Sequence, residues 1–281
     1  MNDRAFDFPE NTPKTNRSKF ILVILLTVLV LFLLHSIVGP PLIFAFPVIG
    51  ILVLIIMRPQ LSRSEVYYAL TLAVVAGIAG LGSAWVTIQL PIWATLQFAL
   101  VLFGLLAGWS ILNQTGLSRA GIGRNILITQ RAGAALRSFF QGLLIAMPWA
   151  LGMIALGSAN EENWVSSWWQ PLVAIQPGIA EEAWGRVLLV PLLFLLFRRF
   201  AKDHTALTCA VVVIAYWFAY LHTSGGVDGI FSAIMIGTLF SLPVSYLWLR
   251  RGLETAIGFH FWLDFIKFAA ALLLNEGFLT G

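Results

Sequence analysis

The chain has 281 residues, of which 59% are hydrophobic and 11% are charged, and its mean hydropathy is +0.88. Charged residues make up about 25% of an average soluble domain, so this composition is that of an integral membrane protein. The net charge of +4 fits the basic loops of such a protein, and no basic stretch interleaved with aromatic residues indicates nucleic-acid binding.

Apolar runs along the chain predict an all-α integral membrane protein with about nine transmembrane helices, since a spanning helix needs about 20 mainly apolar residues. The runs are Phe20–Val38, Pro41–Met57, Val66–Thr87, Ile92–Leu112, Leu136–Leu156, Pro171–Phe197, Ala206–His222, Ile230–Leu249 and Thr255–Leu274. The second and seventh runs are short. The first is longer than a signal-peptide core and no small-residue cleavage site follows it, so we interpret it as a retained anchor.

Lysine and arginine predict the orientation, because cytoplasmic loops are enriched in both. If nine helices cross the membrane, the basic residues between them all fall on the side of the amino-terminal tail. They are Arg4, Lys14, Arg17, Lys19, Arg58, Arg63, Arg119, Arg124, Arg131, Arg137, Arg198, Arg199, Lys202, Arg250 and Arg251. The opposite loops contain the acids Glu161, Glu162 and Asp228. We therefore expect a cytoplasmic amino terminus and localisation in a bacterial plasma membrane.

Ionisable residues at membrane depth gather in three of the nine segments, the sixth, seventh and ninth. They are Glu181, Glu182, Arg186, His222, His260, Asp264 and Lys267. A charged side chain at the centre of a bilayer costs about 2.5–3.5 kcal/mol on insertion scales, so such residues usually pair and often mark a functional site.

In the sixth segment, Glu182 and Arg186 are four residues apart and can pair along one helical face. Glu181 is rotated from Glu182 by about 100°, so it points elsewhere. We interpret the pair as structural support and Glu181 as the functional acid.

The other two segments place polar residues at helical spacing. Phe218 and His222 share a face at positions i and i+4, and His260, Asp264 and Lys267 share a face of the ninth segment. Asp264 and Lys267 can form a second ion pair.

Depth in the membrane is a test of whether these residues can meet. With a rise of about 1.5 Å per residue, Glu181 falls in the outer half, His222 near the outer end and His260 in the inner half. Tilted helices, or loops that enter protein-lined cavities, are needed to bring the three together.

Three motifs stand in order, each in an apolar segment: Glu181-Glu182-x-x-x-Arg186, Phe218-x-x-x-His222 and His260-x-x-x-Asp264. Together they resemble the CAAX-protease and bacteriocin-processing family of intramembrane glutamate endopeptidases, also called Abi or type II CAAX-protease-like proteins. The resemblance covers about Leu136 to Ala271. We therefore expect a disordered cytoplasmic tail (1–19), an amino-terminal transmembrane scaffold (20–134) and a CAAX-protease-like membrane domain (135–275).

The resemblance implies hydrolysis of a peptide bond in a membrane-proximal or lipidated peptide, with the bilayer and a peptide or protein substrate as partners and with no cofactor. Glu181 and His222 would activate a water molecule, and His260 and Asp264 would hold the oxyanion. Glu182, Arg186 and Phe218 would support the site.

Asp264 fits its implied role less well than the other catalytic candidates. The family has Asn or Asp at this position, and an Asp donates a hydrogen bond only when it is protonated. Lys267 could keep Asp264 ionised, which leaves it to orient His260 or to stabilise the fold.

Three alternatives stay open. Glu181, His222 and His260 could bind zinc in a metalloprotease, although the chain has no His-Glu-x-x-His sequence. A non-proteolytic immunity or adaptor protein could have kept the fold. A proton-coupled transporter also uses intramembrane acids and histidines, but we find no internal repeat.

Overall fold

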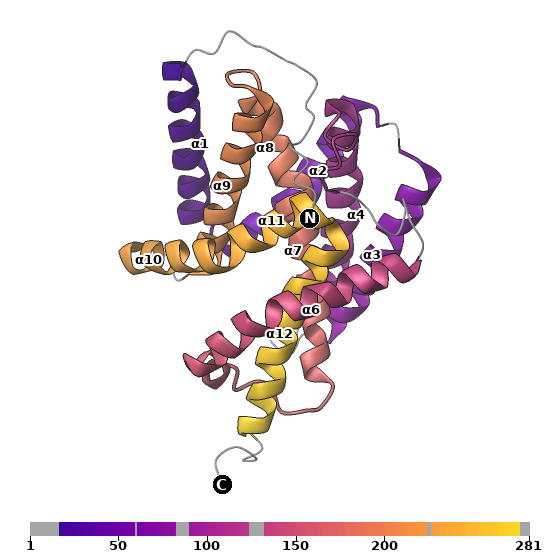
Figure 1. Cartoon of the computed structure of the whole chain (residues 1–281), viewed down its shortest axis with the longest axis vertical. Helices are drawn as coiled ribbons and strands as arrows, with labels where there is room; N and C mark the ends of the chain where they lie inside the picture. The colour runs from indigo at the N-terminus through magenta and orange to yellow at the C-terminus, as the bar shows by residue number, and fades with distance from the viewer. Residues whose placement is uncertain (1–16, 60, 83–89, 124–131, 224–225, 276–281) are drawn as a thin grey trace. The chain divides into compact units, whose positions relative to one another are not determined.

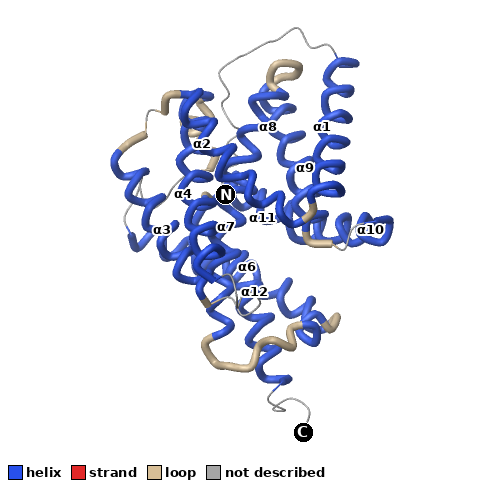
Figure 2. Tube along the Cα trace, turned by 180° about the vertical axis from the view of Figure 1, so that it is seen from behind, coloured by secondary structure: helices blue, strands red, loops and turns tan. Residues whose placement is uncertain are grey.

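The computed structural model describes residues 17–59, 61–82, 90–123, 132–223 and 226–275, and these form helices and connecting loops without a strand (Figure 1, Figure 2). The expected all-α class is confirmed. Residues 1–16 of the expected tail lie outside the described residues, as do Arg124 and Arg131, and the first helix begins at Arg17.

The helices, in chain order, have the following bounds. They are α1 (Arg17–Val38), η1 (Pro40–Phe44), α2 (Ala45–Met57), α3 (Arg63–Leu81), α4 (Leu90–Thr115), α6 (Ala132–Ala155), η2 (Ser158–Glu161), η3 (Gln170–Ala174), α7 (Ile175–Glu181), η4 (Glu182–Leu189), α8 (Val190–Phe197), α9 (Asp203–Leu221), α10 (Gly226–Ile236), η5 (Gly237–Ser241), α11 (Leu242–Arg251) and α12 (Leu253–Asn275).

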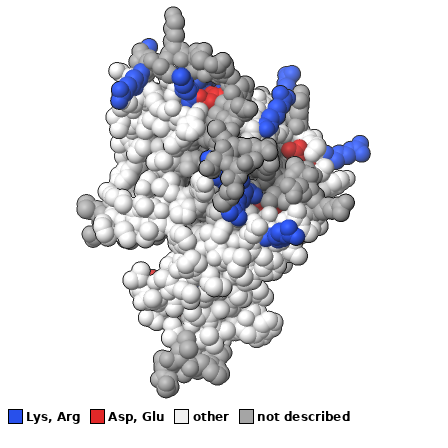
Figure 3. Space-filling model, in the orientation of Figure 1, with Lys and Arg blue, Asp and Glu red and all other residues white. Residues whose placement is uncertain are grey.

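Seven helices of the described residues are long and apolar enough to cross a membrane, and each matches one of the nine apolar runs. The run at Pro41–Met57 forms the shorter helix α2, and the run at Pro171–Phe197 is helical in several pieces. Large apolar side chains on these helices are exposed, and most of the surface in Figure 3 carries neither basic nor acidic groups. The chain is therefore an integral membrane protein.

Two of the nine runs are less regular than their sequences predict. The sixth contains the π-helical stretch η4, which begins at Glu182, and the eighth contains the π-helical turn η5. A π-helix bonds residue i to i+5 and is often found at functional sites. Helical-wheel spacing for an α-helix therefore does not hold from Glu182 onward.

The chain forms two compact units, each made of three stretches. Unit 1 contains Met1–Leu61, Phe103–Arg124 and Trp184–Arg250, and unit 2 contains Ser62–Leu102, Asn125–Ala183 and Arg251–Gly281. The chain passes from unit 2 to unit 1 inside η4, so the first motif contributes residues to both units. The division expected from the sequence at residue 135 stays a prediction.

In unit 1, the amino-terminal helices pack on the helices that carry the first two motifs. Helix α1 runs beside α9 in both views (Figure 1, Figure 2), where Trp217 Nε1 donates a hydrogen bond of 3.0 Å to the Leu31 carbonyl. Phe46 of α2 stacks on Trp184 of η4 with ring centroids 4.6 Å apart. These aromatic contacts connect the scaffold to the start of η4.

In unit 2, α6 and α12 pack with their backbones in close contact. A Cβ atom on Gly142 of α6 would collide with the backbone of Gly258 and Phe259, and one on Gly258 would collide with Phe139. Small residues at such positions let membrane helices approach closely, which replaces the hydrophobic driving force that lipid does not provide.

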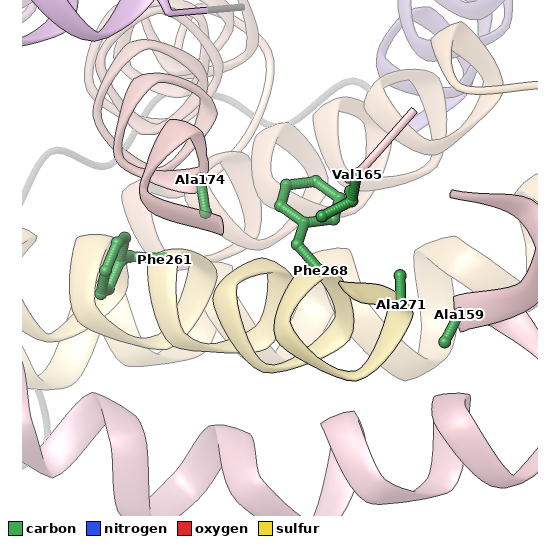
Figure 4. Packing of buried hydrophobic residues seen from close by; sticks show 6 residues of the cluster. All are labelled: Ala159, Val165, Ala174, Phe261, Phe268 and Ala271. Atoms are coloured by element: carbon green, nitrogen blue, oxygen red, sulfur yellow. The ribbon is translucent and has the colours of Figure 1, made fainter. Parts of the chain in front are cut away.

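The segment between α6 and α7 packs against one face of α12. Figure 4 shows Ala159, Val165 and Ala174 of this segment facing Phe261, Phe268 and Ala271 of α12, and all six are buried. The side chain of Asn275 donates a hydrogen bond of 2.7 Å to the Val165 carbonyl. This packing places Glu162 next to the polar face of α12.

Candidate functional site

Gly178 brings α7 close to α12 beside His260. A Cβ atom at Gly178 would lie 3.1 Å from the backbone nitrogen of Phe261 and 3.2 Å from its Cα atom, so a larger residue would push the helices apart. Glu181 follows Gly178 by three residues and therefore lies on the same side of α7. This approach removes the depth difference between Glu181 and His260 that the sequence suggested.

Three carboxylates surround the buried imidazole of His260. Its Nδ1 atom lies 2.8 Å from Glu182 Oε1, and its Nε2 atom lies 3.6 Å from Glu181 Oε2 and 3.7 Å from Asp264 Oδ2. The side chain of Glu182 is fully buried, whereas those of Glu181 and Asp264 are 21% and 18% exposed. Four of the residues singled out in the sequence therefore meet within unit 2.

The hydrogen bond between His260 and Glu182 determines which ring nitrogen of His260 carries a proton. An ionised carboxylate only accepts hydrogen bonds, so with Glu182 ionised the shared proton is on Nδ1 of His260. The Nε2 atom then faces Glu181 and Asp264. Nε2 can donate a hydrogen bond as well only if the ring carries a proton on both nitrogens. Carboxylate oxygens lie near both nitrogens and can accept those hydrogen bonds.

Glu182 and Arg186 each have described contacts beyond the pair expected between them. The described contacts of Glu182 lead to His260, and those of Arg186 lead to Ser241 and to the Phe218 ring. Glu182 lies at the junction of α7 and the π-helical stretch η4, and its carboxylate contacts the same imidazole that Glu181 faces. The roles of Glu181 as the functional acid and of Glu182 with Arg186 as a supporting ion pair stay predictions.

Lys267 continues the polar face of α12 away from His260. Its ammonium nitrogen lies 2.7 Å from Glu162 Oε1 and 4.0 Å from Asp264 Oδ1. Trp164 Nε1 donates a 2.6 Å hydrogen bond to the other carboxylate oxygen of Glu162. Sequence reasoning placed Glu162 in an outer loop and missed this role. The nearby tryptophan was the only signal in the sequence.

In unit 1, Arg186 is fully buried and is held by the second motif. Its guanidinium carbon lies 4.1 Å from the centroid of the Phe218 ring, and its Nη2 atom donates a hydrogen bond of 2.8 Å to Ser241 Oγ. A cation over an aromatic face is stabilised by about 2 kcal/mol or more when both groups are desolvated. Phe218 therefore supports a buried charge.

His222 caps the carboxyl end of α9 and is exposed. Its ring lies 4.6 Å from that of Phe218, as their spacing predicts, and its Nδ1 atom lies 2.8 Å from the Phe218 carbonyl oxygen. A carbonyl oxygen only accepts, so Nδ1 carries the proton and Nε2 of the neutral ring carries a lone pair. The ring is thus oriented to accept a proton at Nε2.

The described residues contain no group of three or more His, Cys, Asp or Glu side chains arranged to hold a metal ion. The zinc alternative needs Glu181 and His260 from unit 2 and His222 from unit 1, and it stays open.

Residues 163–266 match the family model described as type II CAAX prenyl endopeptidase Rce1-like. The match includes all three motifs and lies inside the region from Leu136 to Ala271, so the resemblance stated from the sequence is confirmed. The expected enzyme class, a protease, is confirmed with it. No curated protein and no solved structure matches the chain significantly.

Proposed function

We propose that this protein, whose residues 163–266 belong to the Rce1-like family of type II CAAX prenyl endopeptidases, cleaves a membrane-proximal or lipidated peptide with a water molecule activated by Glu181 and His222. The observation that carries the proposal is the cluster of three carboxylates, from Glu181, Glu182 and Asp264, around the buried His260 in a protein of apolar helices. Ionisable groups are costly in a membrane, so a cluster of them commonly marks a functional site.

The proposed chemistry is the addition of water to a peptide carbonyl. The carboxylate of Glu181, together with Nε2 of His222, takes a proton as the water oxygen bonds to the carbonyl carbon. The carbonyl electron pair moves to oxygen and forms a tetrahedral oxyanion. The C–N bond then breaks as the stored proton passes to the leaving nitrogen. The mechanism requires Glu181 and His222 to share one water molecule.

His260 is proposed to stabilise the oxyanion. Because Nδ1 is engaged by Glu182, the hydrogen bond to the oxyanion must come from Nε2 of a ring that carries both protons. A donor placed in advance where negative charge develops is typically a large catalytic contribution. Glu182 acts as a positioning residue in this scheme, since its fully buried carboxylate fixes the ring orientation.

Asp264 is proposed to act as an acceptor instead of an oxyanion donor. One carboxylate oxygen of Asp264 lies 3.7 Å from His260 Nε2, and the other lies 4.0 Å from Lys267 Nζ. Both nitrogen atoms can carry a proton and act as donors. An ionised aspartate accepts hydrogen bonds from such groups and donates none. Asp264 then orients His260 and balances its charge.

The decisive experiment is comparative membrane proteomics of cells that carry the wild-type protein or Glu181→Gln. The variant keeps the shape of the side chain but removes the base, so we expect at least a 100-fold loss of cleavage and accumulation of an uncleaved peptide. Glu161→Gln removes an exposed acid from the same unit and serves as the matched control with wild-type processing. A correctly inserted Glu181→Gln protein with full phenotype would instead support the non-proteolytic adaptor.

Metal dependence separates the proposed mechanism from the zinc alternative. We propose that the side chains alone activate the water, so activity on the peptide found by proteomics should survive exhaustive chelation in protein that lacks stoichiometric metal. Activity that is lost on chelation and restored by zinc would establish the metalloprotease with Glu181, His222 and His260 as ligands.

For the substrate we propose a chemical class, and for the membrane its type and the orientation of the protein in it. The family description supports a peptide with a prenyl group, and other membrane-proximal peptides satisfy the same chemistry. The asymmetry of lysine and arginine between loops supports a bacterial plasma membrane with a cytoplasmic amino terminus.

A further inference from the structure

Unit 1 contains a groove of about 720 Å³ that none of the three motifs lines. One wall is formed by Val53, Ile56 and Met57, which share a face of α2, and the other by Leu192 and Leu195 of α8. The volume lies in the range of about 300–1,000 Å³ that is usual for small-molecule sites.

Basic residues lie at one end of the groove, where both helices end. Arg198 and Arg199 follow α8 directly and line the groove, and Arg58 follows Met57 at the end of α2. The positive-inside pattern predicts that both of these loops lie on the same side of the membrane. The joint lining by Met57, Arg198 and Arg199 agrees with that prediction.

The charge at this end is positive overall. Arg198 forms an ion pair with Asp203, and the distance from Arg198 Nη2 to Asp203 Oδ2 is 3.2 Å. Arg199 is exposed and, within the described parts of the chain, has no ion-pair partner. Basic residues favour helix carboxyl ends, which explains part of their placement. This preference does not explain the apolar groove that leads away from them.

The lining restricts the chemistry of an occupant. Among the described residues that line the groove, Arg198 and Arg199 are the charged or polar ones. An extended peptide would leave backbone groups without hydrogen bonds along the apolar walls, which is costly in a membrane. An acyl chain has no such groups, and a phosphate next to it would match the arginines. Basic pockets on the cytoplasmic side commonly bind anionic lipid headgroups.

We propose that this groove binds an anionic phospholipid, with one acyl chain between α2 and α8 and the phosphate at Arg198 and Arg199. The site is separate from the motif residues and its occupation does not depend on the proposed peptidase activity.

The test is thermal unfolding of the purified full-length protein in neutral detergent. It compares phosphatidylglycerol, phosphatidylcholine with the same acyl chains, and inorganic phosphate. We expect phosphatidylglycerol to raise the unfolding temperature at the lowest concentration. Arg199→Gln should raise the half-saturating concentration of phosphatidylglycerol about fivefold, the effect of one basic residue at an anionic surface. Arg63→Gln removes the same charge from an exposed site outside the groove and should change nothing.

A second variant tests the acyl-chain site. Ile56 is 76% exposed, so Ile56→Trp should fold, fill part of the groove and weaken the effect of phosphatidylglycerol. The proposal is overturned if the wild-type protein does not distinguish the two lipids, or if Arg199→Gln and Ile56→Trp both keep the wild-type response. Inorganic phosphate that alone reproduces the stabilisation would overturn it in favour of a free-anion site.

Discussion

At the scale of single residues, charges at membrane depth are tolerated because each has a specific partner. Glu182 contacts the Nδ1 atom of His260, and Arg186 contacts Ser241 and the face of Phe218. Breaking a buried pair by removing one member is strongly destabilising, since the other charge stays behind without compensation. The same reasoning applies to Lys267, which lies between Glu162 and Asp264.

We predict that Glu162 and Lys267 are energetically coupled. Each side chain is less than one-fifth exposed and their charged atoms are 2.7 Å apart, so a double-mutant cycle with Glu162→Gln and Lys267→Met should give a coupling of about 0.5–3 kcal/mol. Thermal unfolding of the four proteins in detergent measures it. Lys267→Met should have the larger single effect, because Asp264 also loses a cation.

Glu161→Gln is the matched control for this cycle, because Glu161 is the exposed neighbour of Glu162 and acts on Lys267 through its charge alone, without a hydrogen bond. Its effect should stay within about 0.5 kcal/mol, as for most surface substitutions. Additive effects of Glu162→Gln and Lys267→Met would show that the ion pair does not stabilise the segment between α6 and α7.

At the scale of helices, the polar cluster depends on how closely apolar helices pack. Gly178 lets α7 approach Phe261, and Gly142 and Gly258 let α6 approach α12. The contact of Glu182 with His260 lies at the junction of α7 and the π-helical stretch η4. The packing of the helices therefore contributes to which charged groups meet.

We predict that Gly142→Ala destabilises the protein by about 1–3 kcal/mol, because the added Cβ atom has no room beside Gly258 and Phe259. Gly152→Ala on the same helix is the matched control, since its Cβ atom meets nothing within 4 Å. It should be neutral or stabilising by up to about 1 kcal/mol. Thermal unfolding midpoints of both variants check the difference, and equal midpoints would contradict it.

At the scale of the whole molecule, the distribution of lysine and arginine predicts a single orientation. The family match covers residues 163–266 and adds the enzyme class, whereas the orientation rests on the sequence alone. The only cysteine of the sequence, Cys209, lies in α9 and is free, so one substitution gives a cysteine-free background for accessibility mapping.

In a Cys209→Ala background expressed in bacteria, we predict that Glu161→Cys reacts with a membrane-impermeant thiol reagent in intact cells. Lys202→Cys should react only after permeabilisation, because its loop is predicted to be cytoplasmic. Both positions are exposed in the structure. The Cys209→Ala protein alone is the blank, and the reverse labelling pattern would refute the orientation.

Properties that are local along the chain can be predicted from its sequence. The length of apolar runs predicts membrane helices, and helical spacing puts Phe218 with His222 and His260 with Asp264 and Lys267. The three motifs together also indicated the family whose model matches residues 163–266.

Contacts between charged groups that are distant in the sequence follow from the packing of the helices. Glu182 and His260 are 78 residues apart, and they meet where Gly178 lets the backbones of α7 and α12 approach closely. Glu162 reaches Lys267 because the segment after α6 folds over α12. Neither event leaves a periodic signal, since both result from packing between distant segments instead of the repeat of one helix.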